Sequence, residues 1–328
     1  MKYTLLGSTG VEVSRLAFGT MSFGNEADEA TSATLYHLTR EAGINIFDTA
    51  NVYSQGRSEE ILGRLIEEGN DRDNIVLATK VFGGTGTDRN HRGNSRRHIL
   101  WEVERSLKRL RTDRIDVYFL HGFDEKTPVE ETLGALDTLV QSGKILYPAV
   151  SNWAAWQIAD ALGISESRNW AKFQVLQPIY SLVKRQVESE IFPLAQAKNL
   201  AVLPYSPLGS GLLTGKYNDG KRPEVGRLLV NERHARRYRD EETYDIAQRF
   251  TDYAQTHGVS PITLAVAWAA SHPAVTAPII GARNVAQLNE SLAAADVELS
   301  PTQRKEISQL SYTPPLATDR RENQEDRE

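Results

Sequence analysis

Cysteine is absent from the 328 residues of this chain. Without thiols, the chain has no disulfide framework, no thiolate nucleophile and no cysteine-bound zinc or iron–sulfur cluster. Long hydrophobic runs are absent as well, so we expect neither a membrane-spanning helix nor the apolar segment of a signal peptide. These absences together predict a cytoplasmic protein that has no membrane partner.

An excess of positive charge is also missing. The 38 lysine and arginine residues are outnumbered by 43 aspartate and glutamate residues, which gives a formal net charge of −5. Nucleic-acid binding relies on a positive field that neutralises phosphates, so we expect no nucleic-acid partner. Apolar residues make up 40% of the chain, as is typical of a globular protein. A chain of this length can bury about three quarters of its surface, so a large core is available.

Short apolar runs alternate along the chain with amphipathic helical patterns. The predicted strands are Leu16–Gly19, Ile44–Asp48, Ile75–Lys80, Ile115–His121, Ile145–Ser151, Phe173–Gln177, Ala201–Tyr205 and Thr276–Gly281. The predicted helices are Asp28–Ala42, Ser58–Glu68, Arg97–Leu110, Val129–Gln141, Ala154–Leu162, Val187–Lys198, Glu242–His257, Pro261–Ser271 and Val285–Ala295. Gly43, Gly69 and Gly143 follow three of these helices and are expected to be left-handed caps. Continuous hydrophobic strands are typical of a parallel sheet buried on both faces.

Eight strand–helix alternations without a Gly-x-Gly-x-x-Gly turn favour a closed (β/α)8 TIM barrel over an open, doubly wound sheet. The remaining length is expected in an N-terminal β-hairpin over Tyr3–Val13, in the loop Phe82–Arg97 and in the long connection Ser206–Glu241. No internal linker is visible, so residues 1–317 are predicted to form a single domain. The charged and polar residues 318–328 are predicted to form a disordered tail.

Three neighbouring predicted strands end in ionisable residues, at the end of the barrel where active sites lie. Asp48 ends the second strand, Lys80 the third and His121 the fourth, and Tyr53 lies in the loop after the second. Taken singly, each residue could have a purely structural role. Asp48 and Lys80 could form a structural ion pair, Tyr53 could be a packed loop aromatic and His121 a core histidine. Because buried charges are costly unless paired, we interpret the four together as a catalytic group.

The chemistry of these four residues points to carbonyl reduction. A tyrosine is a weak acid at neutral pH, and a neighbouring ammonium is expected to lower the pKa of its phenol. Asp48 would hold the Lys80 ammonium, Tyr53 would donate a proton to a carbonyl oxygen, and a neutral His121 would orient that oxygen. The group contains no nucleophile, and no metal site is predicted in the chain. The hydride is therefore expected from a reduced nicotinamide.

Four segments, Ile46–Tyr53, Ser58–Gly63, Ala78–Lys80 and Asp116–His121, resemble the signature of the aldo-keto reductase superfamily. The resemblance extends from the N-terminal hairpin to about Ala295. It implies a (β/α)8 barrel that binds NADP(H) in an extended form without a Rossmann unit. It also implies a catalytic tetrad, which in this chain consists of Asp48, Tyr53, Lys80 and His121.

The same resemblance implies the cofactor-binding residues. Those expected around the nicotinamide are Gly19, Thr20, Met21, Asp48, Ser151, Asn152, Gln177 and Tyr205, of which Tyr205 would stack on the ring. Those expected along the pyrophosphate and the adenosine 2′-phosphate are Ser206, Leu208, Ser210, Gly281, Arg283, Gln287 and Ser291. Ser291 stands where many members have asparagine, and Gly281 where others have lysine. A preference for NADP(H) over NAD(H) therefore depends on Arg283 and Gln287.

Aromatic residues just beyond the strand ends are candidates for the substrate pocket. Phe23, Phe82, Phe123 and Trp153 are expected either to line it, together with Tyr53 and His121, or to cap the barrel. A basic cluster in the long connection is expected either to be a solvated face or to give an additional phosphate contact. Its members are Arg233, Arg236, Arg237 and Arg239.

The sequence thus predicts an oxidoreductase that reduces aldehydes or ketones with hydride from NADPH. Its only predicted partner is a small-molecule carbonyl substrate, and a monomer is expected. The alternative is a regulatory NADP(H)-binding subunit, similar to the barrel subunits attached to potassium channels, with slow or vestigial reductase activity. The complete tetrad favours the enzyme.

Overall fold

The computed structural model describes residues 1–220, 223 and 226–318, and eight parallel strands in this part of the chain form a barrel. Along the sheet the strand order is β10-β3-β4-β5-β6-β7-β8-β9. The strands are β3 (Ala17–Gly19), β4 (Ile46–Asp48), β5 (Val76–Val81), β6 (Ile115–Leu120), β7 (Ile145–Ser151), β8 (Val175–Gln177), β9 (Ala201–Val202) and β10 (Ile279–Ile280). Tyr205, just after β9, forms a parallel bridge with Ile279 of β10 and closes the ring. The predicted (β/α)8 barrel is confirmed.

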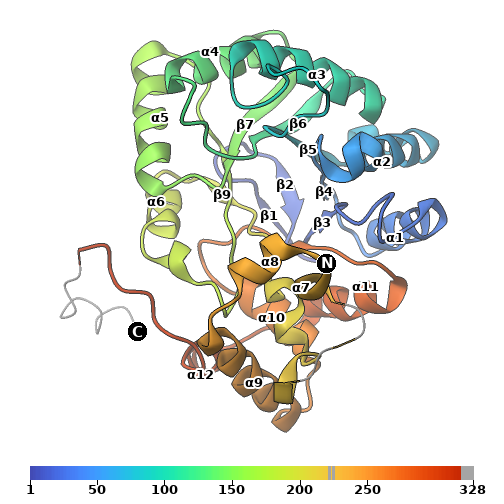
Figure 1. Cartoon of the computed structure of the whole chain (residues 1–328), viewed down its shortest axis with the longest axis vertical. Coiled ribbons are helices and arrows are strands. Elements are labelled where there is room, and N and C mark those ends of the chain that lie inside the picture. Colours follow the sequence, from blue (N-terminus) through green and yellow to red (C-terminus); the bar gives the residue numbers. More distant parts are fainter. Residues whose placement is uncertain (221–222, 224–225, 319–328) are drawn as a thin grey trace.

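Helices surround the ring of strands, and α8 lies in front of it in Figure 1. The helices up to β9 are α1 (Glu29–Glu41), α2 (Arg57–Glu68), α3 (Arg96–Leu110), α4 (Val129–Gln141), α5 (Ala155–Arg168) and α6 (Ile191–Ala197). The later ones are α7 (Arg227–Val230), α8 (Glu232–Arg237), α9 (Glu241–Thr256), α10 (Pro261–Ala270), α11 (Val285–Leu292) and α12 (Pro301–Ser308). Within the described ranges, none of the helices has the length and apolar character needed to cross a bilayer.

The predicted N-terminal hairpin is present and closes one end of the barrel. Strands β1 (Tyr3–Leu5) and β2 (Glu12–Ser14) pair antiparallel, with Thr4 opposite Val13. Leu6 and Val13 are fully buried and pack with the inward-facing side chains of the barrel strands. This hairpin fills the N-terminal end of the barrel, so the opposite end is left for the loops that follow the strands.

Most of the predicted element boundaries hold, and the departures have local causes. Gly43 and Gly143 have φ of 85° and 73°, as expected for left-handed caps, but Gly69 has φ −79°. The left-handed position after α2 belongs instead to Asn70, with φ 51°, because asparagine tolerates this conformation better than most residues. Helix α5 continues past its predicted end at Leu162 and stops only at left-handed Asn169.

The sequence reading missed three helices. Helix α12 begins at a capping box in which Ser300 and Gln303 exchange side-chain to backbone hydrogen bonds, a readable signal before Pro301. The short helices α7 and α8 lie within the long connection Ser206–Glu241. The predicted tail lies, except for its first residue, outside the described part of the chain.

A glycine in α2 permits close packing against α3. A Cβ atom on Gly63 would lie 2.6 Å from the backbone of Arg109 and Leu110, whereas a Cβ on Gly163 of α5 would meet nothing within 4 Å. We expect Gly63→Ala to lower the free energy of unfolding by about 1 to 3 kcal/mol through overpacking. The matched change Gly163→Ala is expected to raise it by about 0.5 to 1 kcal/mol. Chemical denaturation checks both, and equal effects of the two changes would contradict the packing described.

Candidate functional site

The barrel brings all four predicted tetrad residues together at its open end. Lys80 in β5 has no solvent exposure, and its Nζ donates to Asp48 Oδ2 at 2.6 Å and to the Thr49 carbonyl at 2.7 Å. The same Nζ lies 3.3 Å from the Tyr53 hydroxyl. The Tyr53 and His121 rings lie edge to face, with centroids 6.0 Å apart. A carboxylate, an ammonium and a phenol therefore form a row that ends beside an imidazole.

Local backbone geometry turns Tyr53 toward Lys80. The two residues after it, Ser54 and Gln55, have positive φ of 48° and 56°. These values reverse the chain in the loop that joins β4 to α2. The Ser54 hydroxyl donates to the Phe23 carbonyl at 2.9 Å, which fixes the reversed loop. Strained, positive φ values at non-glycine residues are concentrated at functional sites.

Burial dominates the protonation of Tyr53. It raises the pKa of the phenol above its usual value, and the nearby Lys80 charge acts in the opposite direction. The expected net lowering of this pKa is therefore wrong: Tyr53 stays protonated at neutral pH. Burial also lowers the pKa of Lys80, but the Asp48 charge and the interactions of the ammonium with Asp48 and Tyr53 outweigh burial and leave the Lys80 pKa above its usual value.

His121 is neutral at physiological pH. Burial first, and then the charges of Lys80 and Arg233, lower its pKa to about 3. A neutral imidazole offers one donor nitrogen and one acceptor nitrogen, so it can hydrogen-bond a carbonyl oxygen without carrying a charge.

A chain of hydrogen bonds connects the tetrad to the residues predicted around a nicotinamide. Asp48 Oδ1 accepts from Gln177 Nε2 at 2.7 Å, and the Gln177 carbonyl accepts from the Ser151 hydroxyl at 2.8 Å. Asn152 Nδ2 donates to Ser151 Oγ at 2.9 Å, and Asn152 Oδ1 accepts from the Tyr205 hydroxyl at 2.8 Å. Four strand ends are thereby connected, and the Gln177 amide lies beside the Asp48–Lys80 pair.

The loop after Tyr205 is sharply wound, and positive charges lie near it. Ser206 and Ser210 have φ of 61° and 57°, and the glycines around Ser210 are also left-handed. Burial and the charges of Arg283 and Arg227 lower the pKa of Lys216. Of these three cations, only Arg227 has a carboxylate partner within the described ranges, Glu26 at 3.3 Å. A polyanion would relieve their mutual repulsion, so this group of residues fits the phosphates of a dinucleotide.

The segment after β10 brings part of the predicted adenosine site to the surface. Gly281 lies beside Gly19, and a Cβ on Gly281 would be in van der Waals contact with the Gly19 carbonyl oxygen at 3.4 Å. The Arg283 amide donates to Gln287 Oε1 at 3.2 Å, and both side chains are partly exposed near the start of α11. Ser291 does not join them, since its side chain is only 2% exposed on the packed face of α11.

Thr20 and Met21, the two residues after β3, contribute to the site mainly through backbone hydrogen bonds and side-chain packing. Thr20 is fully buried, its hydroxyl 2.8 Å from Ser58 Oγ, and its amide donates to the Asp48 carbonyl at 2.8 Å. Met21 is partly exposed, and Leu208 of the later loop is partly exposed as well.

Two of the four predicted pocket aromatics are packing residues. Phe23 is fully buried against Phe18, so it caps the core and does not line an open pocket. Trp153 is 4% exposed and packs edge-on between Phe123 and Phe173, with centroids 4.9 and 5.6 Å away. Phe82 and Phe123 are partly exposed and remain candidates for the pocket lining.

Sequence reasoning missed an exposed tryptophan next to these aromatics. Trp156 is 67% exposed, and its ring centroid lies 6.5 Å from that of Phe123. The available signal was a second tryptophan four residues after Asn152, at the start of α5. Its exposure makes it a candidate contact for an apolar substrate.

A buried ionic network supports β5 from behind. Thr79, beside Lys80 in the strand, donates to Glu59 Oε1 at 2.5 Å. Arg109 joins Glu59 and Glu102 through contacts of 2.6 and 2.5 Å. Both carboxylates are fully buried, so the network explains Glu59 of the Ser-Glu-Glu run of α2 as a structural residue.

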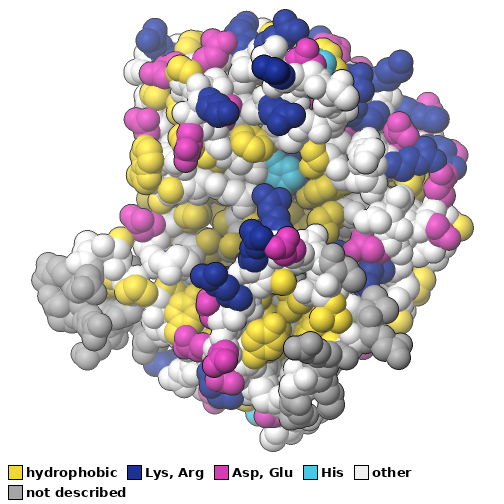
Figure 2. All heavy atoms as spheres, in the orientation of Figure 1, with side chains coloured by type: hydrophobic (Ala, Val, Ile, Leu, Met, Phe, Trp, Pro, Cys, Tyr) yellow, Lys and Arg dark blue, Asp and Glu magenta, His cyan; other side chains and the backbone are white. Residues whose placement is uncertain are grey.

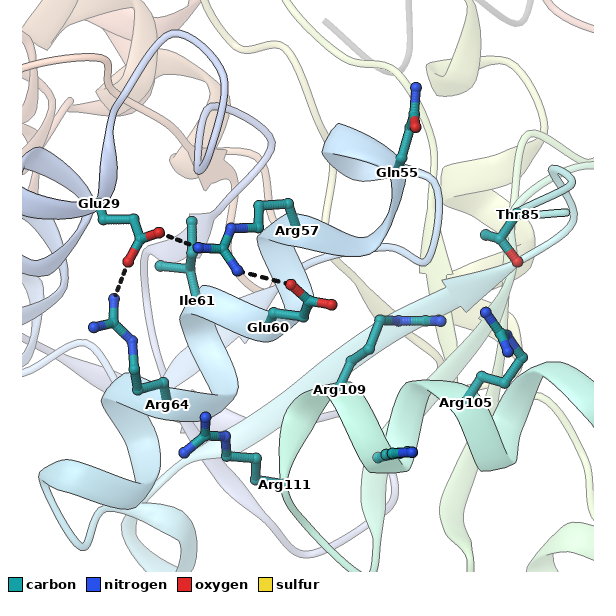
Figure 3. A pocket seen from close by; sticks show the side chains of 11 residues that line it. Glu29, Gln55, Arg57, Glu60, Ile61, Arg64, Thr85, Arg105, Arg109 and Arg111 are labelled. Carbon is teal, nitrogen blue, oxygen red and sulfur yellow. Dashed lines mark hydrogen bonds and ion pairs between the residues drawn. The ribbon is translucent and has the colours of Figure 1, made fainter.

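A cavity of about 570 Å³ lies outside the barrel between α2 and α3 and is rich in arginine (Figure 3). Its cations largely have partners: Arg57 contacts Glu29 and Glu60, and Arg64 contacts Glu29. No tetrad residue lines it. No group of three His, Asp or Glu residues able to hold a metal ion occurs among the residues that the structure describes.

Comparison with known proteins agrees with this geometry. The sequence model of the "Aldo/keto reductase family" matches residues 15–311. The chain is 38% identical over 322 residues to the "Probable voltage-gated potassium channel subunit beta" of Arabidopsis thaliana, covering 96% of this chain and 98% of the relative. It is 37% identical over 311 residues to the "Uncharacterized oxidoreductase YrpG" of Bacillus subtilis, covering 91% and 92%. It is 32% identical over 332 residues to the "Versiconal hemiacetal acetate reductase" of Aspergillus parasiticus, covering 92% and 94%.

The chain therefore belongs to the aldo/keto reductase family. Several relatives carry oxidoreductase or reductase names, which supports an oxidoreductase.

The buried pair of Asp48 and Lys80 can be tested without any substrate. Lys80→Met would leave the Asp48 carboxylate buried beside no cation, so we expect it to lower the free energy of unfolding by about 3 to 5 kcal/mol. The double variant D48N/K80M removes both charges, and its asparagine still accepts from Gln177. It is expected to recover most of that loss. Urea denaturation measures both variants, and additive losses would contradict a coupled pair.

Proposed function

We propose that this chain is an NADPH-dependent reductase of aldehydes and ketones, and that residues 1–317 form its single catalytic domain. One observation carries this proposal: the Lys80 ammonium lies between the Asp48 carboxylate and the Tyr53 hydroxyl. The Tyr53 phenol, held beside this ammonium and next to a neutral His121, is suited to protonate the alkoxide that develops when a carbonyl is reduced.

In the proposed mechanism, NADPH supplies the hydride and the chain supplies the proton. A substrate carbonyl oxygen would accept hydrogen bonds from the Tyr53 hydroxyl and from neutral His121. Because burial keeps Tyr53 protonated, the proton is present when negative charge develops on that oxygen. Lys80 stabilises the phenolate that remains, and Asp48 holds the Lys80 ammonium in position. Asp48, Tyr53, Lys80 and His121 are therefore the proposed catalytic residues.

The cofactor contacts follow the same geometry. Ser151, Asn152 and Gln177 are proposed to hold the nicotinamide carboxamide, and Tyr205 its ring, since their hydrogen bonds lead directly to Asp48. The Ser206–Tyr217 loop, with Lys216, is proposed to hold the pyrophosphate. Arg283 and Gln287 near the start of α11 are proposed to hold the 2′-phosphate of NADP(H), because a helix start and a guanidinium both favour anions.

A second candidate function is supported by the names of relatives. Several are called potassium channel beta subunits, among them those of Arabidopsis thaliana and Oryza sativa. A regulatory subunit would bind NADP(H) and respond to its redox state with slow turnover. Steady-state oxidation of NADPH with 4-nitrobenzaldehyde separates the two functions: an enzyme turns over repeatedly, whereas a sensor gives little beyond one slow turnover.

Replacing the proposed proton donor tests the enzyme directly. Tyr53→Phe keeps the ring and removes the hydroxyl, so kcat for 4-nitrobenzaldehyde is expected to fall about 100-fold to 10,000-fold. The affinity for NADPH, measured by fluorescence titration, is expected to change little.

Tyr244→Phe is the matched control, because Tyr244 is 38% exposed on α9 and outside the proposed site. It should retain the full rate. A Tyr53→Phe protein that keeps most of its turnover would remove Tyr53 from the mechanism.

A further inference from the structure

We propose that α8 recognises an anionic group on the substrate, so that this reductase favours carbonyl compounds that carry a carboxylate. The recognising residues are Arg233 and Arg237. This inference rests on the proposed reductase function and assigns a substrate class to the same site.

Of the arginines on and next to α8, some have a carboxylate partner and others do not. Arg236 contacts Glu232 at 2.5 Å, and Arg239 lies 3.9 Å from Asp240. In the part of the chain that the structure describes, Arg233 and Arg237 have no carboxylate partner within ion-pair distance. Residues four apart lie on the same face of a helix, so these two guanidinium groups share one face of α8.

Two contacts fix the rotation of α8. His234 Nδ1 lies 2.7 Å from Ser210 Oγ in the loop that follows Tyr205, and Tyr238, directly after the helix, is fully buried. With this rotation the Arg237 guanidinium lies 5.7 Å from the centroid of the Tyr205 ring. Figure 2 shows basic side chains over α8 that reach a histidine in a hollow bordered by hydrophobic side chains.

Arg233 acts on the reacting end of the site. Burial lowers the pKa of His121, and the charges of Lys80 and Arg233 lower it further. Burial raises the pKa of Tyr205, and the charges of Arg237 and Arg233 act against that rise. The unneutralised guanidinium pair therefore faces the residues proposed to hold the carbonyl group and the nicotinamide ring.

A different group of cations is placed for the phosphates of the cofactor. Lys216, Arg227 and Arg283 lie near one another, around the wound loop and the start of α11. Arg227 lies near both groups, since its charge, after the larger effect of burial, also helps to lower the pKa of His234 on α8. The positive charge is therefore continuous, from a first region suited to a dinucleotide to a second region on α8 next to the carbonyl position. Guanidinium groups bind carboxylates through charge-assisted hydrogen bonds, which are roughly twice as strong as neutral ones. A carboxylate on the substrate would give the second region a partner.

The test compares two aldehydes of nearly equal shape, 4-carboxybenzaldehyde and 4-nitrobenzaldehyde. For the unmodified protein, kcat/KM is expected to be about 10-fold to 100-fold higher with the carboxylate. In R233Q/R237Q this ratio is expected to fall about 10-fold to 100-fold, a change that cancels the different intrinsic reactivities of the two aldehydes. Arg236→Gln is the matched control, because Arg236 is 74% exposed and already paired with Glu232, and it should keep the unmodified ratio.

Calorimetric titration of 4-carboxybenzaldehyde into the protein saturated with NADP⁺ gives a second readout, which needs no turnover. Binding that weakens with added salt and is lost in R233Q/R237Q would support the proposal. A ratio that R233Q/R237Q leaves unchanged would overturn it. So would a variant that weakens NADPH binding without changing the ratio, because the arginines would then serve the cofactor.

The two proposals fail in different ways. If neither aldehyde is reduced, the proposed function fails, and the titration still decides whether α8 binds the carboxylate. If both aldehydes are reduced at equal rates and R233Q/R237Q behaves like the unmodified protein, the reductase stands and anion recognition by α8 fails.

Discussion

The burial of a single ammonium group, that of Lys80, determines the arrangement at the open end of this barrel. A fully buried cation is tolerated only with close partners, and Lys80 has the Asp48 carboxylate and the Thr49 carbonyl within 2.7 Å. Parallel pairing of β4 with β5 makes this possible, since it places Asp48 opposite Ala78, two residues before Lys80. The Tyr53 hydroxyl then joins this pair from the reversed loop after β4.

The remaining polar groups of the site are connected to this pair. Asp48 uses its second oxygen to accept from Gln177, and the hydrogen bonds continue through Ser151 and Asn152 to Tyr205. Tyr205 also closes the ring between β9 and β10, so the closure of the barrel and the geometry of the site depend on the same residue. Within the long connection after β9, the contact between Ser210 and His234 joins α8 to the loop that follows Tyr205. Fold and site are therefore stabilised together.

Much of this could be predicted from the sequence because strand ends are local features. The apolar runs that end in Asp48, Lys80 and His121 are visible in the chain, and a barrel necessarily brings neighbouring strand ends together. Side-chain burial depends on distant residues and was predicted less well. The sequence left open whether Phe23 lines the pocket or caps the barrel, and the structure packs it on Phe18. Ser291, a predicted cofactor contact, lies on the packed face of α11. The pKa of Tyr53 also rises, because desolvation outweighs the neighbouring charge, a balance that only the three-dimensional environment determines.

The most direct test of this account is an NMR titration of Lys80, followed through its side-chain resonances and assigned with K80M. The account predicts that the Lys80 amine stays protonated to a pH above about 10.4, the usual pKa of lysine, because Asp48 and Tyr53 outweigh burial. Loss of that proton near neutral pH would show that burial dominates. The row of carboxylate, ammonium and phenol would then not exist in the charge state on which the proposed chemistry depends.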